Sequence, residues 1–153
     1  MQVNGYGSEA DNKANHVGVN INDMNSSVNK PAAYIKEGTK AQKEEFNMEE
    51  SDVVQAWIDY GGEEKIVDVT IAPISLPKKP SKPLISHTID LQEVLQETMF
   101  VGFLASTGES KASSHYVLGW SLGLCMSGKE LLIVWVYVRT KTWRCVVGHI
   151  FFV

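Results

Sequence analysis

Short segments in which apolar residues alternate with polar or small ones recur along the chain. In the segment 16–22, Val17, Val19 and Ile21 occupy every second position. A period of two is typical of a β-strand that buries one face. We therefore expect a half-buried strand here, and the polar residues 22–31 that follow are expected to form turns.

Two further alternating segments, 52–60 and 66–72, are joined by a loop that begins with two glycines. Such a loop between two alternating segments predicts a β-hairpin. In the first segment Ala56 and Ile58 share one face, and Trp57 lies on the other. We expect Trp57 to pack against the sheet rather than to bind a ligand.

Three segments depart from this pattern. Residues 73–83 contain four prolines, which exclude a helix or a central strand and predict an extended surface loop. In the segment 89–97, Asp90 is followed three residues later by Glu93, the spacing of a helix N-cap, so a short helix is expected. The charged segment 36–51 is interpreted as a solvated connection or an edge strand.

The segments 99–106 and 115–122 complete the predicted strands, and the polar loop 107–114 lies between them. Several short strands separated by turns, with one short helix, indicate an antiparallel all-β domain. Half-apolar strands in this number favour a β-sandwich.

The last part of the chain has a different character. The runs 131–138 and 145–153 are dense in β-branched and aromatic residues and lack clean alternation. They are interpreted either as buried strands or as a divergent apolar tail that selection has not shaped. Read-through of non-coding sequence, or a shifted reading frame, would produce such a tail, with a junction near Ser121.

Composition and charge narrow the class of function. The chain is 44% apolar and carries a net charge of −4, and its basic residues are scattered. It can therefore bury a core, and nucleic acid is not expected as a partner because phosphate contacts need a basic face. The N-terminus does not resemble a signal peptide, and the apolar run 131–138 is too short to span a membrane. Cys125 and Cys145 form no metal or redox motif, and a disulfide between them is left open.

Asp11 and His16 lie five residues apart at the start of the first strand. They are either a turn-capping acid and a surface histidine or ligands of a metal ion. The adjacent glutamates at 44–45 and 63–64 would point to opposite faces of a strand, so neither pair forms a catalytic site, and no enzymatic activity is expected. Two further histidines are interpreted as surface residues, His87 and His115.

Six segments together resemble the legume-lectin (L-type lectin) domain, and most nearly the ectodomains of plant L-type lectin receptor kinases. These segments are "NHVGVNIN", "VQAWIDY", "VDVTIAP", "KPSKPLIS", "IDLQEVLQETMFVGFLASTG" and "SHYVLGWS". The resemblance implies an all-β, concanavalin A-like antiparallel β-sandwich. It divides the chain into a partial legume-lectin domain at 1–122 and the divergent apolar tail at 123–153.

The resemblance also implies a calcium ion and a manganese ion that hold a sugar-binding loop in place. Calcium binds oxygen ligands, and manganese accepts carboxylates together with an imidazole. Asp11 matches the acid that bridges the two ions in the family, and His16 matches the histidine that binds the transition metal. Ser26 matches a position that reaches this metal through water.

Carbohydrate is the implied partner, and it is bound without catalysis. Asn4 matches the asparagine that contacts the sugar, with Tyr6 close to the same place. Glu109 and Ser110 match contact positions in the loop that gives sugar specificity. Two aromatic residues match core positions of strands instead, Phe103 and Trp120.

The resemblance is to the C-terminal part of the domain. The chain begins just after the place where the family has a Glu-x-Asp strand that supplies two metal-binding acids, so we expect calcium and manganese binding to be weak or lost. The alternative to carbohydrate binding is a non-binding remnant or a module that pairs, including with itself, through exposed strands. The family is extracellular or a plasma-membrane ectodomain; the chain has no recognisable signal peptide, membrane helix or kinase motif, so no location is assigned.

Overall fold

The computed structural model describes residues 2–3, 15–22, 26–37, 42–48, 53–95, 98–106, 114–125, 131–141 and 147–152. Twelve strands lie within these ranges. They are β1 (Gln2–Val3), β2 (His16–Asn20), β3 (Ser26–Pro31), β4 (Ala33–Lys36), β5 (Gln42–Glu45), β6 (Val54–Gly61), β7 (Ile66–Pro73), β8 (Ile85–Thr88), β9 (Val101–Ser106), β10 (Ser114–Cys125), β11 (Leu131–Lys141) and β12 (Val147–Phe152).

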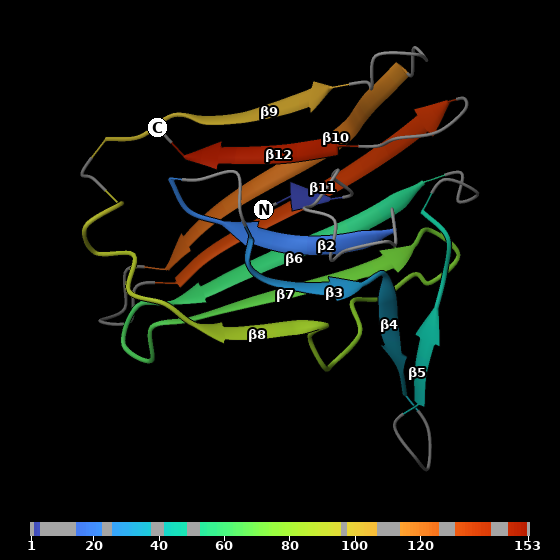
Figure 1. Cartoon of the computed structure of the whole chain (residues 1–153), viewed down its shortest axis with the longest axis horizontal. Helices are drawn as coiled ribbons and strands as arrows, with labels where there is room; N and C mark the ends of the chain where they lie inside the picture. The colour runs from blue at the N-terminus through green and yellow to red at the C-terminus, as the bar shows by residue number, and fades with distance from the viewer. Residues whose placement is uncertain are drawn as a thin grey trace.

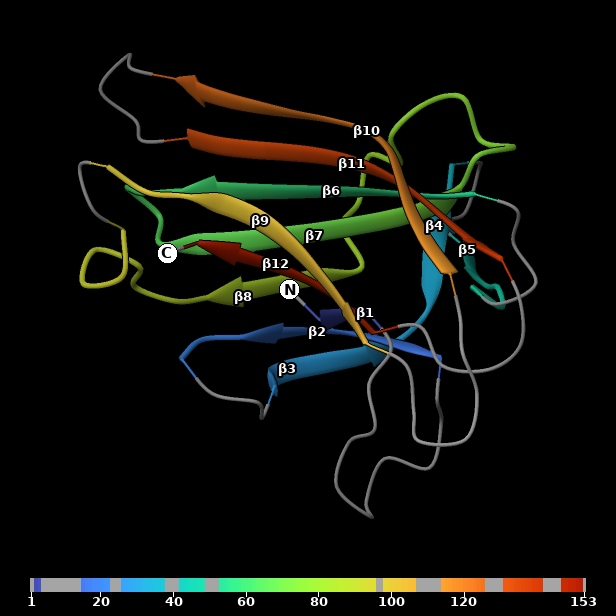
Figure 2. The same cartoon turned by 90° about the horizontal axis from the view of Figure 1, so that it is seen from above.

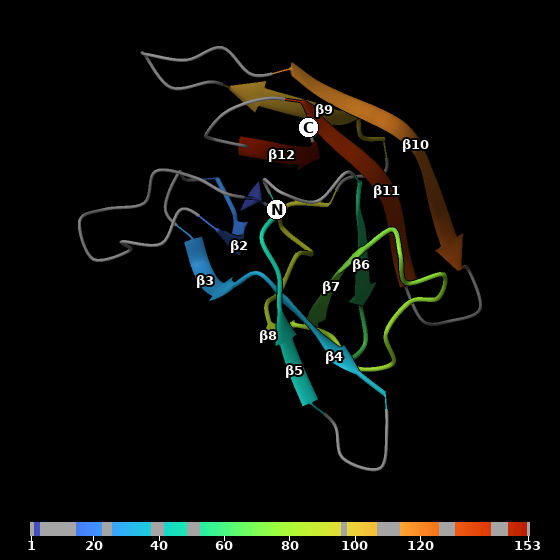
Figure 3. The same cartoon turned by 90° about the vertical axis from the view of Figure 1, so that its right-hand side faces the viewer.

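The strands form two five-stranded sheets and a separate hairpin (Figure 1). One sheet has the order β3-β2-β1-β12-β9, and the other has the order β10-β11-β6-β7-β8. Every pair of neighbouring strands is antiparallel. Figure 3 shows the two sheets side by side as two layers, with β9 and β10 at the same end of each. The expected all-β, antiparallel sandwich is confirmed.

The core lies between these two layers. Buried residues of β2 pack in one cluster with buried residues of β6, β7 and β8. Val17, Val69, Ile71 and Ile85 have no exposed surface. Burial of one such side chain stabilises the fold by about 1.5–3 kcal/mol. The alternation of the sequence therefore places its apolar positions at the interface of the sheets, as expected.

The predicted hairpin is confirmed as β6 and β7, which pair from Val54↔Pro73 to Gly61↔Ile66. Trp57 is buried within it, as expected. The proline-containing segment that follows contains no strand until β8 begins, which confirms the predicted loop. The buried side chain of Gln55 holds this loop, because its Nε2 donates to the carbonyl oxygens of Pro73 and Leu76, at 3.2 and 2.8 Å.

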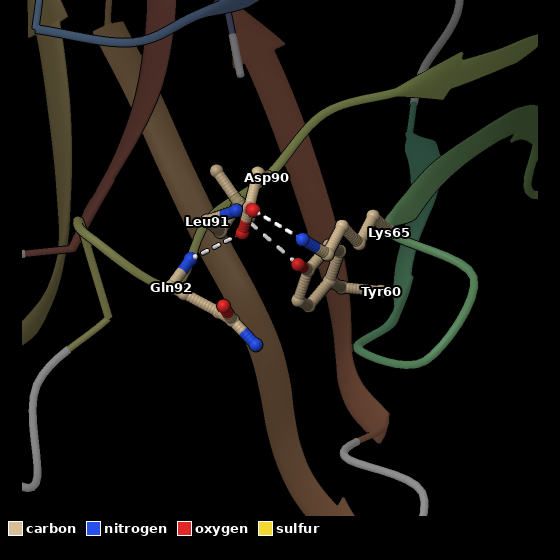
Figure 4. A network of polar contacts seen from close by, with 5 residues as sticks. All are labelled: Tyr60, Lys65, Asp90, Leu91 and Gln92. Atoms are coloured by element: carbon tan, nitrogen blue, oxygen red, sulfur yellow. Dashed lines mark hydrogen bonds and ion pairs between the residues drawn. The ribbon is translucent and has the colours of Figure 1, made fainter.

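The short helix expected at 89–97 is not formed in the described part of that segment. A single turn replaces it, in which the amide of Leu95 donates to the carbonyl oxygen of Leu91 at 2.7 Å. The start of the segment is bonded as a helix start would be (Figure 4): Asp90 Oδ1 accepts a hydrogen bond from the amide of Gln92 at 3.0 Å, and Tyr60 Oη accepts one from the amide of Leu91. The other carboxylate oxygen of Asp90 pairs with Lys65. The weak local helix signal thus gives one turn only.

The polar segment 22–31 is also not simply a turn. Its second half is the edge strand β3, which pairs with β2 from His16↔Pro31 to Asn20↔Ser26. Pro31 ends this strand at the margin of the sheet, where a residue without an amide hydrogen is tolerated. The apolar pattern did not reveal β3, because its side chains are mostly exposed or half-buried.

The charged segment expected as a connection or an edge strand contains β5, which pairs with β4. This hairpin extends away from the two sheets in Figure 1. Tyr34 Oη donates to Glu44 Oε2 at 2.6 Å, and Lys36 forms an ion pair with Glu44 at 3.1 Å. We call β4 and β5 together the arm.

The C-terminal runs are strands inside the two sheets. β11 lies between β10 and β6, and β12 lies between β1 and β9. β10 runs continuously past position 122, where the sequence predicts a boundary. Both runs therefore form strands, while the division at 122 and the origin of the last residues stay predictions. No helix in the described ranges is long and apolar enough to cross a membrane.

Candidate functional site

The site predicted from the sequence begins at the first residue of β2. His16 is only 4% exposed, so the interpretation as a surface histidine is wrong. Because side chains alternate along a strand, His16, Gly18 and Asn20 share one face of β2. We call these three residues the polar face of β2.

Ser26 lies over the polar face. Its Oγ donates to Asn20 Oδ1 at 2.9 Å. A Cβ on residue 18 would collide with that Oγ and would lie 3.1 Å from the Cβ of Ser26. The missing side chain of Gly18 therefore makes the space that Ser26 fills. The structure thus brings Ser26 to the same face of β2 as His16, although the two residues are ten positions apart in the sequence.

The polar face and Ser26 present an imidazole, a hydroxyl and an amide oxygen. Of these, the imidazole is a strong ligand for a transition metal, and the oxygen atoms suit a hard cation or its bound water. These donors fit part of the metal site that the resemblance implies. Across the described ranges no three residues among histidine, cysteine, aspartate and glutamate gather at one point.

Several predicted site residues lie outside the described residues. They are Asn4, Tyr6, Asp11, Glu109 and Ser110. Cys145 also lies outside them, so the disulfide left open with Cys125 is untested. Of the predicted ligands, the structure places His16 and Ser26.

Asn15, which the sequence did not single out, occupies the position before His16 and joins three segments. Its Nδ2 donates to the carbonyl oxygen of Phe46 at 2.8 Å, and its Oδ1 accepts the amide of Met48 at 3.1 Å. Its own carbonyl oxygen accepts the amide of Ala32 at 2.9 Å. No sequence signal distinguishes it, because its partners are 17 to 33 positions away.

The aromatic residues expected in strand cores differ from each other. Phe103 is half-buried, whereas Trp120 is 51% exposed, so the expectation for Trp120 is wrong. Their rings contact edge-on, with centroids 5.7 Å apart and an interplanar angle of 70°. Among the described strands, β10 is the last of its sheet, next to β11.

His115, expected at the surface, is half-buried. Both of its ring nitrogens are buried and have no hydrogen-bond partner among the described residues. Burial lowers the pKa of its imidazole below the ordinary value of 6.5. His87, on the edge strand β8, is partly exposed. Neither histidine belongs to a group of three or more histidine, cysteine, aspartate or glutamate residues that could hold a metal ion within the described ranges.

Comparison with known proteins extends these observations. The family model of the legume lectin domain matches residues 3–131. The probable L-type lectin-domain containing receptor kinase VI.1 of Arabidopsis thaliana is 39% identical over 137 residues, which are 89% of this chain and 19% of that protein. The L-type lectin-domain containing receptor kinase VI.2 of the same plant is 42% identical over 139 residues, 88% of this chain and 20% of that protein. No solved structure matches the chain.

The chain spans about a fifth of the length of these curated relatives. Legume lectin domains are generally non-catalytic, and their family is generally metal-binding. The match covers most of the described strands, and the antiparallel sandwich agrees with the concanavalin A-like fold of that family. The chain belongs to the legume lectin domain family.

Proposed function

We propose that this chain is a non-catalytic carbohydrate-binding module. The observation that carries the proposal is the legume lectin match over residues 3–131, which includes β2 with its polar face. Carbohydrate is bound reversibly in this proposal. Asn4, Glu109 and Ser110 provide the sugar contacts, the latter two through the loop between β9 and β10.

Calcium and manganese, bound weakly, are the proposed cofactors, with Asp11, His16 and Ser26 as their protein ligands. When bound, the ions would supply fixed positive charge that orders the surrounding loop. The imidazole of His16 suits the transition metal, the carboxylate of Asp11 suits both ions, and the hydroxyl of Ser26 suits a metal-bound water. The position of Ser26 over Gly18, on the face of β2 that also carries His16, supports this assignment.

A thermal melt tests the metal site. An ion that binds only the native state at 100 times its Kd raises the free energy of unfolding by about 2.7 kcal/mol. For a chain of this size, that corresponds to an increase in Tm of roughly 5–11 °C. Calcium and manganese added after a chelator should raise the Tm of the wild type and of Glu93→Gln, a matched control at an exposed acid. The two ions should not raise the Tm of Asp11→Asn. An equal increase in Tm in all three proteins would show that Asp11 is not a metal ligand.

A glycan array then tests the sugar site. The metal-loaded protein should bind one class of glycans, and Asn4→Ala should abolish that binding. Asn29→Ala, at an exposed position of β3, serves as the control and should bind like the wild type. A loaded, folded protein that binds no glycan would contradict the proposed function.

A second candidate function is self-association through β10. This strand is the free edge of its sheet and contains no charged residue. Its Tyr116, Val117, Leu118, Trp120 and Leu122 are all more than 40% exposed. A long edge strand without charged residues is open to pairing with another strand, most of all in the regular part of β10 beyond the register irregularity between Val117 and Gly119. Two copies of β10 can pair antiparallel about a two-fold axis, because such an interface is self-complementary.

Sedimentation velocity over a range of concentrations tests this candidate. The wild type should form a dimer as its concentration rises, and Ser121→Lys should remain a monomer because it places a charge on the edge. Ser86→Lys, at an exposed position of β8 on the other edge of the same sheet, is the matched control and should still dimerise. A wild type that stays monomeric at all concentrations would exclude β10 as a self-association surface.

A further inference from the structure

The segment next to His16 is held by an amide side chain that bonds in both directions. Asn15 donates to the carbonyl oxygen of Phe46 and accepts from the amide of Met48, at 2.8 and 3.1 Å. The carboxamide of Asn15 thus bonds to the backbone groups on both sides of Asn47, one as donor and one as acceptor, as the backbone of a neighbouring strand would. An amide is the side chain that provides one donor and one acceptor for this purpose.

The same point is joined to the other strand of the arm. The amide of Ala32 donates to the carbonyl oxygen of Asn15 at 2.9 Å, and the amide of Phe46 donates to the carbonyl oxygen of Ala32 at 3.2 Å. Asn15, Ala32 and Phe46 therefore form a small ladder of backbone contacts. This ladder connects the start of β2 with both ends of the arm.

The partners of Asn15 are themselves anchored in the core. Ala32 and Met48 are 1% and 2% exposed and belong to the hydrophobic cluster between the sheets, and the partly buried Phe46 packs against that cluster. Close-packed residues transmit displacement because few voids exist to absorb it. A hydrogen-bonded link to them therefore fixes the backbone of Asn15, and through one planar peptide bond the backbone of His16.

We propose that Asn15 is a positioning residue that uses the base of the arm to hold His16 in the orientation needed to bind a metal ion. This inference rests on the proposed function, in which His16 is a metal ligand. Asn15 does not itself coordinate the ion. Groups that orient a metal ligand without touching the metal typically change affinity by about 10- to 100-fold when they are removed.

The test compares two variants, each of which removes a side-chain amide that bonds to two backbone groups. Asn15→Leu removes the link between the arm and β2. Gln55→Leu removes the other side-chain amide that bonds two backbone carbonyl oxygens, those of Pro73 and Leu76, in the opposite sheet. Manganese affinity is measured for each protein, without sugar, from the electron paramagnetic resonance signal of the free ion. Hydrogen exchange of the Val17 and Gly18 amides provides a readout that needs no metal.

Support for the proposal would be a manganese affinity about 10- to 100-fold weaker in Asn15→Leu and unchanged in Gln55→Leu, with faster exchange at Val17 and Gly18 only in Asn15→Leu. If the two variants weaken manganese binding equally, the effect is general destabilisation and the inference is overturned, while the proposed function stands. If the wild type binds no manganese, the proposed metal site fails, and with it the role of Asn15 in metal binding. In that case hydrogen exchange still tests whether Asn15 orders β2. If the Val17 and Gly18 amides exchange at the wild-type rate in Asn15→Leu, this structural role is overturned too.

Discussion

Phe103 of β9 and Trp120 of β10 connect the two sheets at their shared edge by an edge-on ring contact, with centroids 5.7 Å apart. Such an aromatic pair contributes about 0.5–1.5 kcal/mol beyond the burial of its area. Because half of Trp120 remains exposed, we expect Trp120→Ala to lower the free energy of unfolding by about 1–2 kcal/mol, less than for a buried tryptophan. Urea denaturation measures this. A loss above about 4 kcal/mol would mean that another chain covers Trp120 in solution.

Gly18 is required by the close approach of Ser26. We expect Gly18→Ala to lower the free energy of unfolding by about 1–3 kcal/mol, because its Cβ would overlap the Oγ of Ser26. The double variant Gly18→Ala, Ser26→Gly removes the overlap and should regain part of the loss. Denaturation of both variants in urea provides the comparison. An additive loss in the double variant would show that the two residues do not contact in solution.

The hydroxyl oxygen of Tyr60 accepts a hydrogen bond from the backbone amide of Leu91 at 3.2 Å, and Tyr60 is only 1% exposed. Tyr60→Phe removes this acceptor and leaves a partly buried amide unpaired. We expect a loss of about 1 kcal/mol in the free energy of unfolding, measured by chemical denaturation. Tyr116→Phe, at an exposed tyrosine, should change it little.

Lys65 and Asp90 join the β6–β7 turn to the segment after β8. The hydrogen bond from Lys65 lowers the pKa of Asp90 below its ordinary value of 3.8, and the hydrogen bond to Asp90 raises the pKa of Lys65 above 10.5. The stabilisation is therefore complete between these two values. It is lost as pH falls through the lowered pKa of Asp90, or rises through the raised pKa of Lys65.

Accordingly, Lys65→Met should have a lower Tm than the wild type at pH 6, and the difference should shrink in strong acid. Lys78→Met, at an exposed lysine of the proline-containing loop, is the control and should melt like the wild type at each pH. Melting curves over a pH series measure both. A difference between Lys65→Met and the wild type that is independent of pH would point to lost packing rather than a lost ion pair.

His115 should make the protein sensitive to mild acid. Burial lowers the pKa of its imidazole, so the unfolded chain takes up a proton at a higher pH than the folded chain does. Stability is therefore lost as pH falls below the ordinary histidine value of 6.5. We expect His115→Leu to reduce this loss and to raise the Tm at pH 5, because it also removes two buried nitrogens that lack partners in the described part of the chain. A steeper loss of Tm in acid for His115→Leu would contradict this prediction.

The alternating segments were interpreted correctly because their signal is local. β2, β6 and β7 each have a buried apolar face, and a period of two is visible in the sequence alone. The proline-containing loop was equally predictable, since a proline cannot donate to a strand ladder. Asp11 and His16 stood out by residue type and spacing, but this pattern did not decide whether His16 is buried.

The features that the sequence missed depend on distant partners. β3 lacks an apolar pattern and exists because β2 pairs with it. The contacts of the turn after Asp90 with Tyr60 and Lys65 span 31 and 25 positions, so the local sequence pattern did not show them. The role of Asn15 was invisible because its side chain bonds to residues more than 30 positions away.

By itself, the sequence determined the antiparallel β class and the hairpin of β6 and β7, since these follow from the local period of apolar residues. The metal and sugar candidates followed only from the resemblance to the legume-lectin domain. The tertiary structure alone decided that β11 and β12 lie inside the sheets, that β10 is an exposed edge and that Ser26 lies over Gly18. Strand order and burial result from pairing between segments far apart in the chain. The hydrogen bonds and contacts that select one pairing exist only after the chain has folded.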